Sequence, residues 1–205
     1  MYYSKYYCVI QDIAESMTIV VDTREQQTLR LRDRLRAFSE MDLDVERRTL
    51  SVGDYSAYVT LPNGKTLDFC NMISIERKMD VDELMSCFIQ EERTRFEKEL
   101  KRALDMKCVL HCVTEDGCYD DLLNENYKRK ISSQRALGTY HAFEKRYHVH
   151  FGFTSRQAFP RYVFETLRRF IIDYLLENEK IVRDAMREAT AQAKSPDKKH
   201  RSRSS

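Results

Sequence analysis

The 205-residue sequence lacks any apolar run near the roughly 20 residues needed to cross a membrane, and residues 1–16 lack the pattern of a signal peptide. We therefore expect an intracellular, cytoplasmic protein with no membrane partner. The six cysteines include no paired Cys-x-x-Cys motif, so reduced thiols are predicted. A zinc site is the alternative for one group of residues: Cys108, His111, Cys112 and Cys118.

The sequence also lacks a strong overall charge. Its formal net charge is +2, and the last fifteen residues hold five Lys or Arg and one Asp, which leaves −2 for residues 1–190. Any contact with phosphates must therefore come from a local patch or through a metal ion. Residues 191–205 are expected to form a disordered basic tail, either solvated or attached non-specifically to DNA.

Strand-like and helix-like segments alternate along the chain. Strands are predicted at 17–22, 107–113 and 148–153, with a meander of two or three strands over 45–78 that turns at Pro-Asn-Gly, 62–64. Amphipathic periodicity predicts helices at 27–41, 80–104, 133–147 and 160–190, whereas 115–130 is expected to be a loop. This order indicates an α/β domain at 17–190, a mixed sheet with helices on both faces, preceded by an extension at 1–16. The helix at 160–190 either packs across the sheet or forms a partner surface.

Three polar clusters follow strand-like segments: DTREQ (22–26), GDY (53–55) and ERKMDVD (76–82). Strand alternation puts Glu76 and Lys78 on one face, and folding back of the meander would bring Asp54 beside Glu76. Carboxylates of this kind hold Mg²⁺, which polarises a phosphodiester and activates water, while a nearby lysine offsets developing charge. Each cluster alone also fits a simpler interpretation: a turn, a solvated strand face, or a surface ion pair between Arg24 and Glu25.

Taken together and in order, VDTREQ, LSVGDY, IERKMDVDEL and RTRFEKEL resemble the nuclease domain of the xeroderma pigmentosum group F (XPF, or ERCC4) family. That resemblance, over residues 17–180, implies the restriction-endonuclease-like PD-(D/E)xK fold. The family's cellular members carry a helix-hairpin-helix module after this domain, which has no counterpart here. The sequence resembles the stand-alone members found in phages and other mobile elements.

The resemblance also implies roles for individual residues. The implied metal ligands are Asp54, Glu76 and Asp22. The other implied catalytic residues are Lys78, Arg77, Glu25 and Asp82. The implied DNA contacts are Arg24, Arg77, Arg93 and Arg95. Two of these assignments compete with simpler ones: Asp82 lies in a helix start that Asp80 and Glu83 could cap, and Arg93 and Arg95 could form a solvated helix face.

The implied activity is that of a Mg²⁺-dependent DNA endonuclease, with Mn²⁺ able to substitute, acting on flap, fork or junction DNA in repair or recombination. The implied products carry 5′-phosphate and 3′-hydroxyl ends. Two alternatives stay open: a catalytically silent DNA-binding scaffold, and an enzyme of the same fold in restriction or junction resolution. DNA is the expected partner, with a homodimer or a replication or recombination protein as further options, and no nucleotide cofactor is expected.

Overall fold

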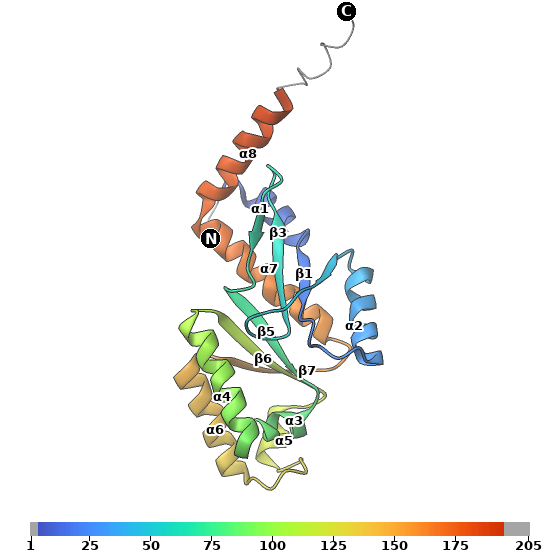
Figure 1. Ribbon diagram of the computed structural model, residues 1–205, viewed down its shortest axis with the longest axis vertical. Coiled ribbons are helices and arrows are strands. Elements are labelled where there is room, and N and C mark those ends of the chain that lie inside the picture. The colour runs from blue at the N-terminus through green and yellow to red at the C-terminus, as the bar shows by residue number, and fades with distance from the viewer. Residues whose placement is uncertain (1–3, 195–205) are drawn as a thin grey trace, which may run out of the picture.

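The computed structural model describes residues 4–194 as a seven-stranded mixed sheet with helices on both faces, which confirms the predicted fold class (Figure 1). The helices are α1 (Tyr7–Glu15), α2 (Leu29–Glu40), α3 (Val81–Ser86), α4 (Gln90–Asp105), α5 (Tyr119–Leu123), α6 (Ser133–Tyr147), α7 (Phe159–Glu177) and α8 (Glu179–Lys194). The strands are β1 (Thr18–Val21), β2 (Val45–Arg47), β3 (Tyr55–Thr60), β4 (Thr66–Asp68), β5 (Ile73–Lys78), β6 (Val109–Glu115) and β7 (His150–Thr154).

Strand β5 occupies the middle of the sheet, in the order β2-β1-β3-β5-β6-β7, and β4 extends the sheet by pairing with β3. It runs parallel to β6 along its whole length, from Ile73 to Lys78. Its pairing with the antiparallel β3 is confined to Tyr55 opposite Ile75. Because β3 begins at Tyr55 and runs antiparallel, no residue of β3 lies opposite the second half of β5, where Glu76, Arg77 and Lys78 lie.

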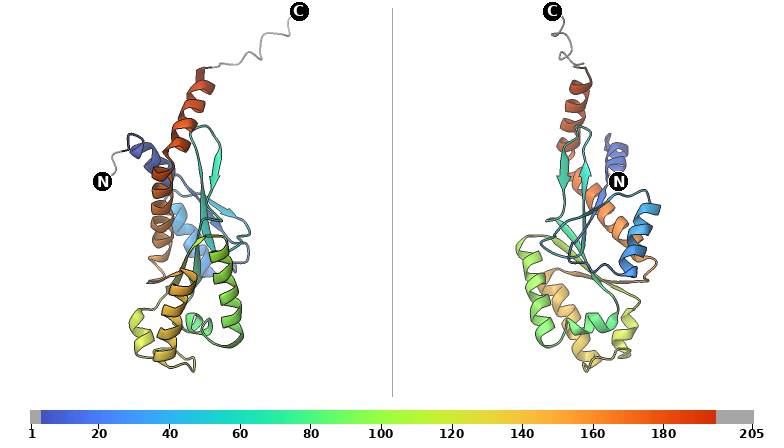
Figure 2. Two further views of the ribbon diagram at one scale, coloured as in Figure 1. Left: turned by 90° about the vertical axis from the view of Figure 1, so that its left-hand side faces the viewer. Right: turned by 45° about the vertical axis from the view of Figure 1, so that its right-hand side comes forward.

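Two apolar cores cover the two faces of the sheet, because strand side chains alternate. On one face Ile73, Ile75 and Val113 pack with α1, α2, α7 and α8. On the other face Leu110 and Cys112 pack with α3, α4, α5 and α6. Figure 2 shows α7 and α4 on opposite sides of the sheet. Within the described part of the chain, no helix is long and apolar enough to cross a membrane.

Four details of the predicted elements are wrong. The helix expected at 80–104 is divided into α3 and α4 at residues 87–89, because Phe88 is buried in the core, Ile89 has an extended backbone and Gln90 has a φ of +51°. The helix expected at 160–190 ends at Asn178, whose side-chain amide donates to the Tyr174 carbonyl, and α8 follows. The expected loop at 115–130 contains α5, held by buried Leu122. The expected meander at 45–78 contains four strands, of which β2 leaves to pair with β1.

The structure describes most of the N-terminal segment but only the start of the predicted C-terminal tail. Residues 1–16, expected as an extension, contribute α1, whose Ile10, Ile13 and Ala14 are buried in the core shared with α7. At the other end, α8 continues to Lys194, and the remainder of the predicted tail lies outside the described residues.

Candidate active site

Strand β5 presents Glu76 and Lys78 together on the face that packs against α4. Lys78 Nζ lies 2.6 Å from Glu76 Oε1, and the two side chains are only 8% and 10% exposed. Burial opposes the charge on Lys78, but the charges of Glu76, Cys87 and Cys112 and the hydrogen bond to Glu76 together outweigh burial and raise the lysine pKa well above its usual value. The ammonium group also lies 5.0 Å from the centre of the Phe96 ring. Lys78 is therefore a buried, fixed positive charge.

Asp54 lies beside this pair, directly before the first residue of β3. Its backbone N–H donates to the Ile75 carbonyl at 2.9 Å, and its Oδ2 accepts the Arg77 backbone N–H at 2.8 Å. The Asp54 carboxylate thus accepts the β5 backbone N–H that the carbonyl of a neighbouring strand would otherwise accept. Burial and the neighbouring Glu76 charge raise the pKa of Asp54 well above its usual value. The predicted convergence of Asp54 and Glu76 is present in the structure.

Glu99 of α4 is a third carboxylate at this site; the motif RTRFEKEL contains it, but no role was predicted for it. Its Oε1 accepts the Gly53 N–H at 3.1 Å, and burial together with the Glu76 charge raises its pKa. The signal for it was its place in the helix, because it lies between buried Phe96 and Leu100 on the side that faces the sheet.

Asp22, predicted as a metal ligand, is surrounded by hydrogen-bond donors. It is 1% exposed and accepts the Arg24 backbone N–H at 2.6 Å, the Arg24 side chain at 2.8 and 2.9 Å, and the Leu50 N–H at 2.7 Å. Burial opposes its charge, but these hydrogen bonds lower its pKa overall. Asp22 therefore anchors Arg24, whose side chain remains 62% exposed. The Asp22 backbone N–H donates to the Asp54 carbonyl at 2.8 Å, so Arg24 lies on the side of the carboxylate group, and its pKa is raised by the Asp22 hydrogen bond with smaller contributions from Glu99 and Asp54.

Arg77, Glu25 and three partners form a buried network on the opposite face of β5. Glu25 Oε1 accepts from Arg34 at 2.6 Å, Arg77 at 3.0 Å and the Tyr55 hydroxyl at 3.2 Å. Glu115, which is fully buried, accepts from Arg34 at 3.3 Å and Arg77 at 3.5 Å. Two arginines thus face two glutamates, a balanced set of charges. The structure places Glu25 and the Arg77 side chain here, apart from the Glu76–Lys78 pair.

The acids that follow β5 have separate partners. Asp80 caps α3 by accepting the Glu83 N–H at 2.9 Å, and Glu83 Oε2 accepts the Met79 N–H at 2.6 Å, which confirms the predicted helix start. Asp82 takes no part in that cap. Its Oδ1 accepts the Lys128 backbone N–H at 2.5 Å, a contact across to the α5–α6 connection.

The two arginines predicted on α4 differ in their surroundings. Arg93 pairs with Glu97 at 3.1 Å and lies over the Phe143 ring, 5.2 Å from its centre. Arg95 is exposed, one turn before Glu99 on the same side of the helix.

The donor set of this site suits a small, hard cation. Asp54, Glu76 and Glu99 each use one carboxylate oxygen in a protein hydrogen bond, and the second oxygen of each accepts none from residues 4–194. Across those residues, no group of three His, Cys, Asp or Glu side chains closes into a metal cage. Mg²⁺ fits such a site, because it binds through one or two carboxylates and completes its shell with water and substrate phosphates.

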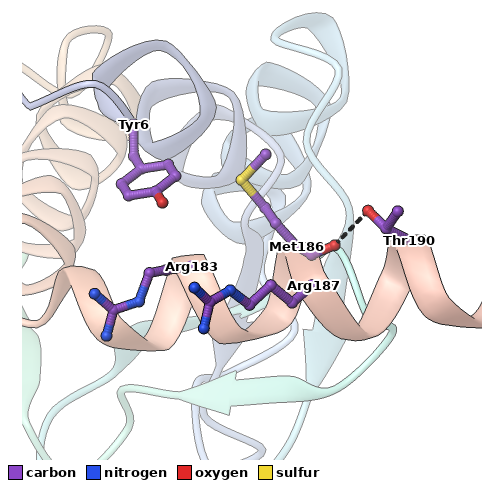
Figure 3. Close-up of a pocket in the computed structure, with 5 residues that line it drawn as sticks. All are labelled: Tyr6, Arg183, Met186, Arg187 and Thr190. Carbon is purple, nitrogen blue, oxygen red and sulfur yellow. Dashed lines mark hydrogen bonds between the residues drawn. The ribbon is translucent and has the colours of Figure 1, made fainter.

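A surface pocket of about 280 Å³ lies between the start of α1 and α8 (Figure 3). Its lining residues are Tyr6, Arg183, Met186, Arg187 and Thr190. This lining contains neither a carboxylate nor a thiol, and it shares no residue with the site on β5. The candidate chemistry therefore remains with Asp54, Glu76, Lys78 and Glu99.

Comparisons with known proteins agree with the motifs and the fold. The model of the family described as ERCC4 domain matches residues 21–192. A structure of XPF from Aeropyrum pernix superposes with a TM-score of 0.51 at 16% identity, covering 74% of this chain and 60% of that one. A structure of XPF from Aeropyrum pernix in complex with DNA gives a TM-score of 0.50 at 17% identity, with 75% and 64% covered.

This chain thus spans less than two thirds of the length of those solved chains, and at such identities the likeness shows the shared fold. No curated protein matches the sequence. Because the family match extends over most of the chain and includes every strand from β2 to β7, the protein belongs to the ERCC4 domain family.

Proposed function

We propose that the protein is a divalent-metal-dependent DNA endonuclease that hydrolyses phosphodiester bonds. The observation that carries the proposal is the excess of carboxylates beside one lysine: Asp54, Glu76 and Glu99 converge around Lys78 in a partly buried site. Such an excess of negative charge is unfavourable by itself and becomes favourable when a cation binds. We propose Mg²⁺, with Mn²⁺ able to replace it, held by Asp54 and Glu76 with Glu99 in support.

Each side chain has a proposed task. The metal ion, when bound, would supply polarisation of the scissile phosphate and activation of water. Lys78 keeps its proton in the field of Glu76, so its task is to stabilise negative charge developing on the phosphate rather than to act as a base. Arg24, held by Asp22 and exposed beside the carboxylates, is placed to contact a neighbouring phosphate. Asp22 then acts as a positioning residue.

The proposed substrates are flap, fork or junction DNAs of repair or recombination. Membership of the ERCC4 domain family supports this choice, and so does the DNA-bound state of one solved relative. The activity is assigned to residues 17–190, with Arg95 as a further backbone contact on α4.

The experiment is a cleavage assay of the purified chain with Mg²⁺ or Mn²⁺ on labelled flap, fork, junction and linear duplex DNAs. We expect cleavage at branch points, and its loss in Asp54→Asn and Glu76→Gln, which preserve shape while removing charge. The matched control is Asp44→Asn, an exposed acid outside the site. Equal cleavage by the wild type and Asp54→Asn would disprove the assignment. Binding without cleavage in either metal would instead identify a silent DNA-binding scaffold.

A further inference from the structure

The connection between α5 and α6 carries three consecutive cations, Lys128, Arg129 and Lys130, which we call the basic loop. All three are exposed, and within residues 4–194 none forms an ion pair with a carboxylate. Arg161 and Arg169 on α7 each have an acidic partner, whereas Arg32 and Arg36 on α2 have none within residues 4–194. The basic loop is therefore a local cluster of unpaired cations on a chain whose first 190 residues sum to −2.

The backbone of the basic loop is fixed by contacts on both sides. The Ser133 N–H donates to Glu125 Oε1 at 2.7 Å, and the Tyr127 hydroxyl donates to the Ile131 carbonyl at 3.1 Å. The Ile131 side chain is 6% exposed and packs in the core formed with α3, α4 and α6. The cations are thus displayed from an ordered segment, which reduces the entropy lost when they bind an anion.

Asp82 ties the basic loop to the proposed catalytic strand. Its Oδ1 accepts the Lys128 backbone N–H at 2.5 Å, and it lies four residues after Lys78, in the first turn of α3. Four residues span at most about 14 Å of chain, so Asp82 lies within that reach of Lys78, and the loop backbone lies one side chain and one hydrogen bond beyond Asp82. Along one DNA strand, about 14 Å corresponds to about four nucleotide steps of 3.4 Å. DNA whose scissile phosphate reaches Lys78 would bring its neighbouring phosphates to the basic loop.

We propose that the basic loop contacts the DNA backbone beside the scissile phosphate, and that Asp82 is a positioning residue that holds it there. This rests on the proposed function of the site on β5. The contact is between cationic side chains and phosphates, so it strengthens binding of any sequence and weakens with salt. It also separates Asp82 from the metal-site acids: its carboxylate is committed to a backbone N–H of another element.

The first test measures DNA affinity without cleavage, by fluorescence anisotropy in EDTA with a labelled forked DNA at several salt concentrations. The variant is Lys128→Gln/Arg129→Gln/Lys130→Gln. The control, Arg161→Gln/Arg169→Gln/Lys180→Gln, removes the same charge from exposed cations on α7 and α8. We expect the loop variant to bind about 10-fold more weakly, with the slope of log K against log salt smaller by about 2 to 3. Equal losses in both variants would overturn the proposal.

The second test compares two substitutions of Asp82. Asp82→Asn keeps an oxygen that accepts the Lys128 N–H, and Asp82→Ala does not. We expect Asp82→Asn to retain DNA affinity and kcat, whereas Asp82→Ala raises KM, leaves kcat, and speeds hydrogen exchange of the Lys128 amide. Loss of kcat in Asp82→Asn would make Asp82 a metal-site acid and refute the positioning role. Because the affinity measurement needs no metal and no cleavage, it tests the loop even if the nuclease assay fails.

Discussion

The buried network of two arginines and two glutamates beside β5 predicts a large loss of stability when one arginine, Arg34, is replaced. Arg34→Met removes a guanidinium that is 2% exposed and contacts Glu25 at 2.6 Å and Glu115 at 3.3 Å. Its Nε also donates to the Tyr55 hydroxyl at 2.8 Å. Methionine has a similar length and no charge, so it fills the space while leaving two buried carboxylates with one arginine, Arg77.

The size of the stability loss depends on which hydrogen-bond donors each glutamate keeps after Arg34 is removed. Glu25 keeps Arg77 at 3.0 Å and Tyr55 at 3.2 Å, but fully buried Glu115 keeps only a 3.5 Å contact with Arg77. Removing one partner of a buried ion pair destabilises a protein by about 3–5 kcal/mol, and the remaining contacts favour the lower end of that range. For a domain of this length, about 3 kcal/mol corresponds to a fall in Tm of about 6–12 °C.

Urea denaturation followed by circular dichroism measures the free energy of unfolding, with Arg168→Met as the control. Arg168 pairs with Glu15 at 2.7 Å at the surface, where the side chains are 22% and 54% exposed, so its loss should be below about 1 kcal/mol. Adding Glu115→Gln to Arg34→Met should restore most of the lost stability, because it removes the stranded charge. A loss in Arg34→Met no larger than the control's would refute this account of the network.

Three further predictions concern the site and its surroundings. Gly53→Ala should destabilise the fold by more than about 1 kcal/mol, since Gly53 has a φ of +70° and an added Cβ would meet the Ser74 hydroxyl at 2.3 Å. The control is Gly64→Ala, where φ is +80° but the added Cβ would meet no atom, so the loss should be smaller. Equal urea midpoints for the two variants would contradict this prediction. Burial and the neighbouring His150 imidazole lower the pKa of His111 to about 4, so unfolding takes up a proton between pH 6.5 and about 4. As the pH is lowered through this range, the free energy of unfolding should decrease by up to about 1.4 kcal/mol per pH unit. His111→Gln should flatten that slope in melts across this range, and an unchanged slope would exclude the residue. Mg²⁺ or Mn²⁺ at 100 times its Kd should stabilise the wild type by about 2.7 kcal/mol and the Asp54→Asn variant far less. The measurement is the increase in Tm on adding the metal, and equal increases in the two proteins would exclude binding at Asp54.

The sequence predicted those features that depend on local periodicity. The helix expected at 133–147 has those same bounds in the structure, because its apolar spacing and its polar flanks agree. Alternation along β5 correctly placed Glu76 beside Lys78 and opposite Ile75. A helix break was missed where the apolar spacing continues across it: buried Phe88 fits the helical period, but Ile89 after it has an extended backbone.

The partners that complete the site could not be predicted, since they join residues far apart in the chain. Arg34 and Glu115 are 81 residues apart, and Lys128 and Asp82 are 46 apart. A sequence shows that each residue is charged, but only the sheet order places β6 beside β5 and so brings Glu115 under Arg77. Glu99 was missed for the same reason, because the loop before β3 brings Gly53 to it.

The two faces of β5 differ in their balance of charged side chains, although Glu76, Arg77 and Lys78 are consecutive residues of one motif. On one face Arg77 joins a buried set of two arginines and two glutamates, which leaves no net charge and no need for a ligand. On the other face Asp54, Glu76 and Glu99 lie near one buried lysine, and burial together with the Glu76 charge raises the pKa of Asp54 and of Glu99. A buried imbalance of this kind lowers stability unless a cation and a substrate complete it. The unbalanced face is therefore where binding and chemistry are expected, and the balanced face is the support that fixes the strand beneath it.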